Sequence, residues 1–368
     1  MDVRLASAAV LVVMSCSGSS AAPRALPSPS AAASIGTPAP HPSPAPVGTI
    51  TEYTIPTANS GPWSIAAGPD GNVWYIEKGL GKVGKVTTSG TITEYFIPTA
   101  NSGPSSITAG RDGNLWLIEQ PGGKVAKVTT NGSFTEYTIP SGCTGISITA
   151  GPDGNLWFTV SCFGSNGNGT VSKVDKVTTS GIFTEYTIPT DSSSPAEITA
   201  GPDGNVWFTE QNASKVAKMT TSGSVTEYIV PTAVSAPLGI TAGPDGNLWF
   251  TEFGTFKVAK VTTSGRFTEY TIPTVPASPG GFTPGPAGIA AGPDGNLWFT
   301  DPYSNKVARV TTSGIFTEYS IPGTVQLSPA LPTSGYPASI TAGPDGNIWF
   351  TEAWGNKVAK VVALPTTP

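Results

Sequence analysis

The segment G-P-D-G-N-x-W recurs along the chain and constrains its fold more than any other feature. Its tryptophans are Trp74, Trp116, Trp157, Trp207, Trp249, Trp298 and Trp349, and one copy has Arg111 in place of the proline. A second segment, T-E-Y-x-x-P, also occurs seven times, starting at Thr51, Thr93, Thr135, Thr184, Thr226, Thr268 and Thr317. A period of about 42 residues indicates repeated units that share one continuous core.

Each period contains four short apolar or β-branched runs, such as S-I-T-A, N-L-W-F-T-E, K-V-A-K-V-T-T and F-T-E-Y-T-I-P. Pro-Asp-Gly-Asn separates the first two and Ser-Gly the last two, so the runs predict antiparallel strands a, b, c and d. Four strands at this period are typical of a propeller blade. We therefore predict an all-β fold, a seven-bladed β-propeller of four-stranded antiparallel blades over residues 49–364.

The order of the two segments predicts how the ring closes. The first T-E-Y run, residues 50–56, precedes the first G-P-D-G-N, whereas the last G-P-D-G-N, residues 343–347, has no T-E-Y run after it. An N-terminal strand d is therefore expected to complete the last blade, which removes the exposed edge of an open array.

The N-terminal region predicts export. Residues 5–15 are an apolar run of the length of a secretory signal, and the run ends at Cys16 in a sequence that resembles a bacterial lipobox. Lipidation at Cys16 and plain secretion are the two alternatives, so the protein is expected to be lipid-anchored at the cell surface or free. Residues 17–48 contain eight prolines and predict an extended tether, and residues 365–368 form a short tail.

The composition limits the classes of partner that the protein can bind. The net charge is −5, only 12% of residues are charged, and no basic cluster is present, which excludes an electrostatic nucleic-acid binder. We expect a monomer that touches a membrane only through a lipid anchor. Its partner is expected to be a small molecule, a glycan or a surface protein.

Loop lengths vary on one face of the predicted propeller. The a–b and c–d turns barely change, whereas the longer segments 161–172, 274–288 and 323–339 belong to b–c loops and d–a connections. We call the face that carries these loops the loop face and expect binding there. Cys143 and Cys162 both map to it and predict a disulfide, the alternative being two unpaired thiols. A catalytic thiol is disfavoured because no histidine accompanies either cysteine.

The repeats resemble the streptogramin lyase (virginiamycin B lyase) family over nearly all of residues 49–364. This resemblance implies a magnesium-dependent elimination that opens a cyclic peptide antibiotic, performed by histidines and glutamates around the central channel. The matching histidine positions follow the residue that leads into strand a, and here they are Trp63, Ser105, Ile146, Ala196, Leu238, Ala287 and Ala338. The only histidine is His41, which lies in the tether.

Carboxylates are the remaining candidates for a proton-abstracting base. Glu197 begins strand a of the fourth blade where the other blades have serine or glycine, which makes it the catalytic candidate. Acids also end strand b in six blades, with Val160 breaking the series: Glu77, Glu119, Glu210, Glu252, Asp301 and Glu352. Glu197, Glu210 and Glu252 are the magnesium candidates. The alternative is that a repeated acid serves its own blade, and the lysines of strand c are expected to be solvated or to pair with the T-E-Y glutamates.

Several aromatic residues lie outside the repeat pattern and map to one sector of the loop face, in blades 5, 6, 7 and 1. These ligand-binding candidates are Trp63, Phe253, Phe256, Phe282, Tyr303, Tyr336 and Trp354. The alternative is that they pack beneath their own loops. The sequence thus favours an exported binding or scaffold propeller, with a magnesium-dependent lyase and a sensor-type propeller as alternatives.

Overall fold

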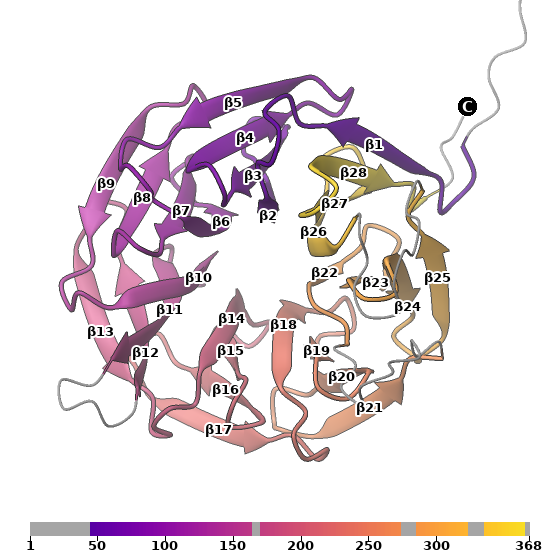
Figure 1. Ribbon diagram of the computed structural model, residues 1–368. Coiled ribbons are helices and arrows are strands. Elements are labelled where there is room, and N and C mark those ends of the chain that lie inside the picture. The colour runs from indigo at the N-terminus through magenta and orange to yellow at the C-terminus, as the bar shows by residue number, and fades with distance from the viewer. Residues whose placement is uncertain (1–44, 164–169, 274–284, 323–334, 365–368) are drawn as a thin grey trace, which may run out of the picture. The chain divides into compact units, whose positions relative to one another are not determined.

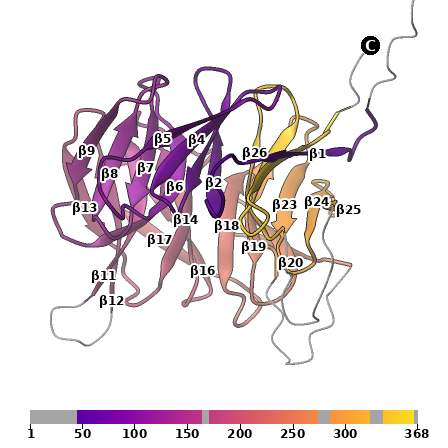
Figure 2. The same ribbon diagram turned by 45° about the horizontal axis from the view of Figure 1, so that its top comes forward.

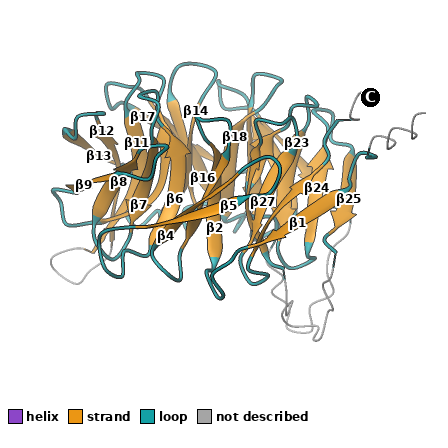
Figure 3. Cartoon of the chain, turned by 90° about the horizontal axis from the view of Figure 1, so that it is seen from above, coloured by secondary structure: helices purple, strands orange, loops and turns teal. Residues whose placement is uncertain are grey.

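The computed structural model describes residues 45–163, 170–273, 285–322 and 335–364, and these fold into seven four-stranded sheets arranged around a central channel (Figure 1). Every pairing within a sheet is antiparallel, and the described residues contain strands and loops but no helix (Figure 3). The predicted all-β, seven-bladed propeller is confirmed. Within these ranges no apolar helix of membrane-spanning length is present.

The strands follow the chain in blade order. Blade 1 contains β2 (Pro62–Ala67), β3 (Val73–Glu77), β4 (Lys82–Val86) and β5 (Ile92–Phe96). Blade 2 contains β6 (Pro104–Ala109), β7 (Leu115–Glu119), β8 (Lys124–Val128) and β9 (Phe134–Thr138). Blade 3 contains β10 (Thr144–Ala150), β11 (Leu156–Phe163), β12 (Thr170–Val177) and β13 (Phe183–Thr187). Blade 4 contains β14 (Pro195–Ala200), β15 (Val206–Glu210), β16 (Lys215–Met219) and β17 (Val225–Ile229).

The remaining blades follow the same plan. Blade 5 contains β18 (Pro237–Ala242), β19 (Leu248–Glu252), β20 (Lys257–Val261) and β21 (Phe267–Thr271). Blade 6 contains β22 (Ile289–Ala291), β23 (Leu297–Asp301), β24 (Lys306–Val310) and β25 (Phe316–Ser320). Blade 7 contains β26 (Pro337–Ala342), β27 (Ile348–Glu352), β28 (Lys357–Val361) and, from the other end of the chain, β1 (Ile50–Thr54).

The pairing of β1 with β28 closes the ring, as predicted. The register places Ile50 opposite Val361 and Thr54 opposite Lys357, and the Val362 N–H donates to the Thr49 carbonyl at 2.9 Å. Blade 7 thus has four strands like its neighbours, and the described repeats leave no unpaired blade edge at the junction.

The repeated G-P-D-G-N-x-W segment is explained by its turn. In blade 1 the buried Trp74 indole donates to Asp70 Oδ1 at 2.9 Å, and Asn72 donates to the same carboxylate. Trp74 also stacks on Tyr95, with Lys85 5.2 Å from the Trp74 ring centroid. Burial alone would raise the pKa of Asp70, but these hydrogen bonds lower it below its usual value. The segment therefore stabilises the face opposite the loop face.

One predicted loop is partly strand. β11 and β12 continue the ladder beyond the length of the other blades, with Ser161 opposite Ser172 and Cys162 opposite Val171. The expected loop over residues 161–172 was therefore wrong in part, because backbone pairing continues into it; Figure 2 shows β11 and β12 side by side. Cys162 forms a disulfide with Cys143, which directly precedes β10. Residues 164–169, 274–284 and 323–334 lie outside the described residues.

Candidate functional site

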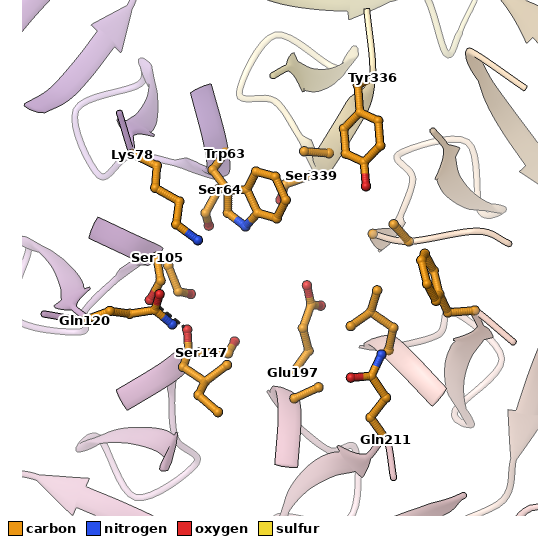
Figure 4. Close-up of a pocket in the computed structure, with 18 residues that line it drawn as sticks. Trp63, Ser64, Lys78, Ser105, Gln120, Ser147, Glu197, Gln211, Tyr336 and Ser339 are labelled. Carbon is orange, nitrogen blue, oxygen red and sulfur yellow. Dashed lines mark hydrogen bonds between the residues drawn. The ribbon is translucent and has the colours of Figure 1, made fainter. Parts of the chain in front are cut away.

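A cavity of about 370 Å³ lies where the seven strands a begin, on the loop-face side of the channel (Figure 4). The seven positions that the family resemblance assigns to histidines all contribute to its lining: Trp63, Ser105, Ile146, Ala196, Leu238, Ala287 and Ala338. Side chains from the b–c loops add Lys78, Gln120, Gln211 and Phe253. The cavity is therefore built from strand starts and b–c loops, where the residues differ from blade to blade.

Backbone irregularities bring these residues to the channel. The pairing of β2 with β3 shifts register between Pro62 and Ile65, and strand a of blades 2, 3, 4, 5 and 7 shifts at the matching place. Such a bulge redirects the side chains between the two paired residues. A buried threonine of the preceding blade then fixes the strand start: Thr351 Oγ1 donates to the Trp63 carbonyl at 2.7 Å, and Thr209 Oγ1 donates to the Leu238 carbonyl at 2.8 Å.

Glu197 extends from β14 into the cavity (Figure 4). Its own N–H donates to Thr209 Oγ1 at 3.1 Å, and its carboxyl accepts a hydrogen bond from the Ile240 backbone. Ser64 plays the same part in blade 1, where its hydroxyl accepts from the N–H of Ile107 at 3.2 Å. Burial raises the pKa of Glu197 to about 7, against a weaker lowering by the Ile240 bond. Glu197 thus keeps an inter-blade hydrogen bond and adds a titratable group to the cavity.

Lys78 is the other charged residue of the lining. It lies in the loop between β3 and β4, and its ammonium is 5.0 Å from the Trp63 ring centroid. Within the described part of the chain, the ion pairs of 4.0 Å or less include neither Lys78 nor Glu197. The sequence analysis missed Lys78, Gln120 and Gln211, although each stands at a b–c loop position that varies between blades, the signal that singled out the aromatic candidates.

Four of the predicted aromatic residues form one cluster at the rim. The Tyr336 ring stacks on Trp354 with centroids 4.5 Å apart, stacks on Trp63 at 6.4 Å, and meets the edge of Tyr303 at 6.0 Å. We call Trp63, Tyr303, Tyr336 and Trp354 the aromatic cluster. Trp63 and Trp354 are 38% and 48% exposed, so the cluster presents ring surface to solvent.

The other three aromatic candidates have separate outcomes. Phe253 lines the cavity. Phe256 is only 7% exposed, so its prediction as a surface residue was wrong. It occupies the left-handed position that Gly81 and Gly123 hold in blades 1 and 2, with φ +52°, and there its ring turns into the protein. Phe282 lies outside the described residues.

The acids that end strand b serve their own blades. Glu210 and Glu252 are fully buried, and neither lines the cavity. Burial raises the pKa of each to about 7, and the charge of the T-E-Y glutamate of its blade, Glu227 or Glu269, also raises it. Those glutamates in turn pair with a strand-c lysine, as in the 2.7 Å contact of Lys215 with Glu227. The predicted lysine–glutamate pairs are present in all seven blades.

In blade 3 the buried acid lies on a different strand from that of the other blades. Val160 stands where the other blades have the strand-b acid, but Asp175 in β12 lies opposite Glu185 and is fully buried. Burial and the charge of Glu185 raise the pKa of Asp175 to about 7. The sequence contained this signal, because the other six blades have glycine or alanine at the Asp175 position: Gly84, Ala126, Ala217, Ala259, Ala308 and Ala359.

The three magnesium candidates do not come together. Glu197 lines the cavity, whereas Glu210 and Glu252 are enclosed in blades 4 and 5. Across the described ranges no group of three histidine, cysteine, aspartate or glutamate residues is placed to hold a metal ion. The cavity offers a single carboxyl whose pKa of about 7 leaves it partly protonated at neutral pH, with aliphatic Ala196 and Leu238 also in the lining. This donor set does not fit a magnesium ion, which prefers ionised oxygen ligands.

The fold and the site define a class: a seven-bladed β-propeller with a cavity at the loop-face end of its channel. The sequence model described as the virginiamycin B lyase family matches residues 44–172 and 282–365. The chain belongs to this family.

Solved structures agree with this assignment. A streptogramin B lyase structure is 34% identical with a TM-score of 0.72, covering 85% of this chain and 96% of that one. The virginiamycin B lyase of Staphylococcus aureus is 34% identical with a TM-score of 0.73, covering 86% and 99%. A catalytically inactive histidine-to-alanine variant of that lyase, solved with quinupristin, is 34% identical with a TM-score of 0.72 over the same shares. Comparison with curated protein sequences gives no match.

Proposed function

We propose that this protein is a non-catalytic binding member of the virginiamycin B lyase family, exported and held at the cell surface or secreted. Its loop-face cavity binds a small molecule that presents an apolar ring to the aromatic cluster. One observation carries the proposal: all seven cavity positions that the resemblance assigns to histidines hold other residues, five of them aliphatic. The export signal and lipobox-like sequence ending at Cys16 support the location.

The rim supports ligand binding independently of the family. Exposed Trp63 and Trp354 flank Tyr336, and Phe253 adds a further ring to the cavity lining. Concave sites with aromatic walls and a few polar groups are typical of small-molecule binding. The volume of about 370 Å³ falls in the range of such sites.

A second candidate function is a lyase that works through a carboxylate. The observation in its favour is the pKa of Glu197, which burial raises to about 7. A group with that pKa is well matched to accepting a proton at neutral pH. Glu197 would be the base, without a metal ion.

Quinupristin distinguishes the two functions, because it is the ligand in the inactive family member. The purified chain is titrated with quinupristin by calorimetry, then incubated with it and separated by chromatography coupled to mass spectrometry, since an eliminated product has the mass of its substrate. The Staphylococcus aureus lyase is the active control. Binding that weakens in Trp63→Ala, with no product, supports the binding protein. Product that disappears in Glu197→Gln overturns it in favour of the lyase.

A further inference from the structure

The loop-face cavity is lined by one basic and one acidic side chain, and neither forms an ion pair with another residue that the structure describes. Lys78 comes from blade 1 and Glu197 from blade 4, and Figure 4 shows the ammonium and the carboxyl both directed into the cavity from different sides. The strand-c lysines of the same blade are paired by contrast, Lys82 with Glu94 and Lys85 with Asp70. The charge pattern of the cavity is therefore not part of the repeat's own ion-pair network.

Both charges are departures from the sevenfold repeat. At the Lys78 position, blades 2, 4, 5, 6 and 7 have Gln120, Gln211, Phe253, Pro302 and Ala353. At the Glu197 position, the other blades have only serine or glycine: Ser64, Ser106, Ser147, Gly239, Gly288 and Ser339. The fold thus forms at these positions without a charge, so folding does not account for either one.

A ligand that fills the cavity displaces water from the carboxyl of Glu197 and covers the side of the exposed Lys78 that faces the cavity. A desolvated charge is costly unless an opposite charge replaces its hydration. An amine on the ligand gives Glu197 a partner that favours its ionised form, and a carboxylate on the ligand gives Lys78 an ionic partner. A ligand with an amine and a carboxylate satisfies both.

We propose that the cavity recognises a zwitterionic ligand of the amino-acid or short-peptide class, with its carboxylate on Lys78, its amine on Glu197 and an apolar ring on the aromatic cluster. This inference rests on the proposed binding function and specifies the chemistry of its ligand. Gln120 and Gln211, whose amides also line the cavity, supply hydrogen bonds to the peptide groups between the two ends.

Chemically blocked peptides test the two ends separately. Calorimetry on the full chain at pH 7 uses phenylalanine, Phe-Gly and Phe-Gly-Gly, which vary the spacing of amine and carboxylate, and the N-acetyl and C-amide form of each. We expect the best-fitting free peptide to bind at least about tenfold more tightly than either blocked form, in line with loss of one charge-assisted contact.

Single-residue variants test which side chain binds the amine and which binds the carboxylate of the peptide. The variant Glu197→Gln keeps an acceptor for the Ile240 N–H. N-acetylation of the peptide is expected to cause no further loss of affinity for this variant. Likewise, C-amidation of the peptide is expected to cause no further loss of affinity for Lys78→Gln. Lys127→Gln is the matched control, because Lys127 lies outside the cavity and donates to the Thr179 carbonyl. In this variant, N-acetylation and C-amidation should each still weaken binding as they do in the unsubstituted protein.

The outcomes separate this inference from the proposed function. If blocked and free peptides bind equally, or if quinupristin binds and no free peptide does, the zwitterion inference is wrong while the binding function stands. If neither quinupristin nor any peptide binds, both are wrong. Penalties that persist unchanged in Glu197→Gln and Lys78→Gln also overturn the inference, since other groups would then hold the two ends.

Discussion

Tyr336 stacks on Trp354 with ring centroids 4.5 Å apart, and it does so from a left-handed backbone conformation with φ +51°. Blades 1 and 2 have Gly61 and Gly103 at the same position before the strand-a proline, with φ +60° and +48°. Glycine adopts such angles without steric cost, whereas a bulky residue is strained by about 1 kcal/mol or more. The chain therefore holds an aromatic ring at the cavity rim where its own repeat would accept glycine.

The position of Tyr336 predicts that its substitution weakens ligand binding but has little effect on the free energy of unfolding. Tyr336→Gly should change the free energy of unfolding by no more than about 1 kcal/mol, because relief of strain offsets the lost stacking. The same change should weaken ligand binding at least about tenfold, as it removes the centre of the aromatic cluster. Thermal unfolding and calorimetric titration measure the two effects. A loss of several kcal/mol with unchanged binding would show that Tyr336 serves the fold alone.

The buried blade acids predict that stability falls as pH rises. Burial raises the pKa values of Glu119, Glu210 and Glu252 to about 7 and those of Glu77 and Glu352 to about 8. In the unfolded chain glutamate titrates near 4.3, so between pH 4.3 and these values the folded state binds more protons. The stability that these acids contribute is therefore fully present below pH 4.3 and is lost progressively until pH 8.

The expected decline is a fall of roughly 5 °C or more in Tm between pH 5 and pH 8, since about 1 kcal/mol shifts the Tm of a mid-sized domain by about 2–4 °C. Thermal unfolding at constant ionic strength measures it. The T-E-Y glutamates, such as Glu136, have lowered pKa values because hydrogen bonds from Lys124 and Thr99 outweigh burial, and they act in the opposite direction only at lower pH. A Tm that rises steadily from pH 5 to pH 8 would contradict the prediction.

Asp175 allows the same effect to be tested at one residue. Asp175→Asn removes a buried acid whose pKa is raised to about 7, so it should stabilise the protein by about 1–3 kcal/mol more at pH 8 than at pH 5. Urea unfolding at the two pH values gives the difference. The exposed Asp191→Asn is the control, and an equal effect of Asp175→Asn at both pH values would refute the explanation.

Ring closure by β1 predicts a strong dependence on a short N-terminal segment. Deleting residues 1–56 removes the strand paired with β28 and exposes an unpaired edge and the blade 7 core, so we expect aggregation or a Tm lower by about 10 °C or more. Deleting only residues 1–42, which precede the first described residue, should leave the Tm unchanged. Size-exclusion chromatography and thermal unfolding compare the two; equal stability would show that the closing strand contributes little.

Much of the fold could be predicted because the same sequence pattern occurs in seven repeats. Alternating apolar runs and Asp-Gly turns define the strands locally, and the position of the first T-E-Y run predicts the pairing of Ile50 with Val361 across the length of the chain. The missing histidines could also be read directly, since their positions are fixed by the repeat.

The site was only partly predictable, because side-chain direction depends on backbone detail. Phe256 and Trp354 are both non-repeated loop aromatics, yet a left-handed φ turns the first inward while the second stays 48% exposed. Likewise, Asp175 replaces the acid missing at Val160 only because β12 places it opposite Glu185.

The sequence by itself determined the blade number, the strand order, the closing strand and the absence of histidines from the channel, since each follows from local pattern and spacing. Only the tertiary structure decided that Lys78 of blade 1 and Glu197 of blade 4 line one cavity. The physical reason is that a ring brings together residues more than a hundred positions apart, at distances set by bulges and inter-blade hydrogen bonds that no local pattern encodes.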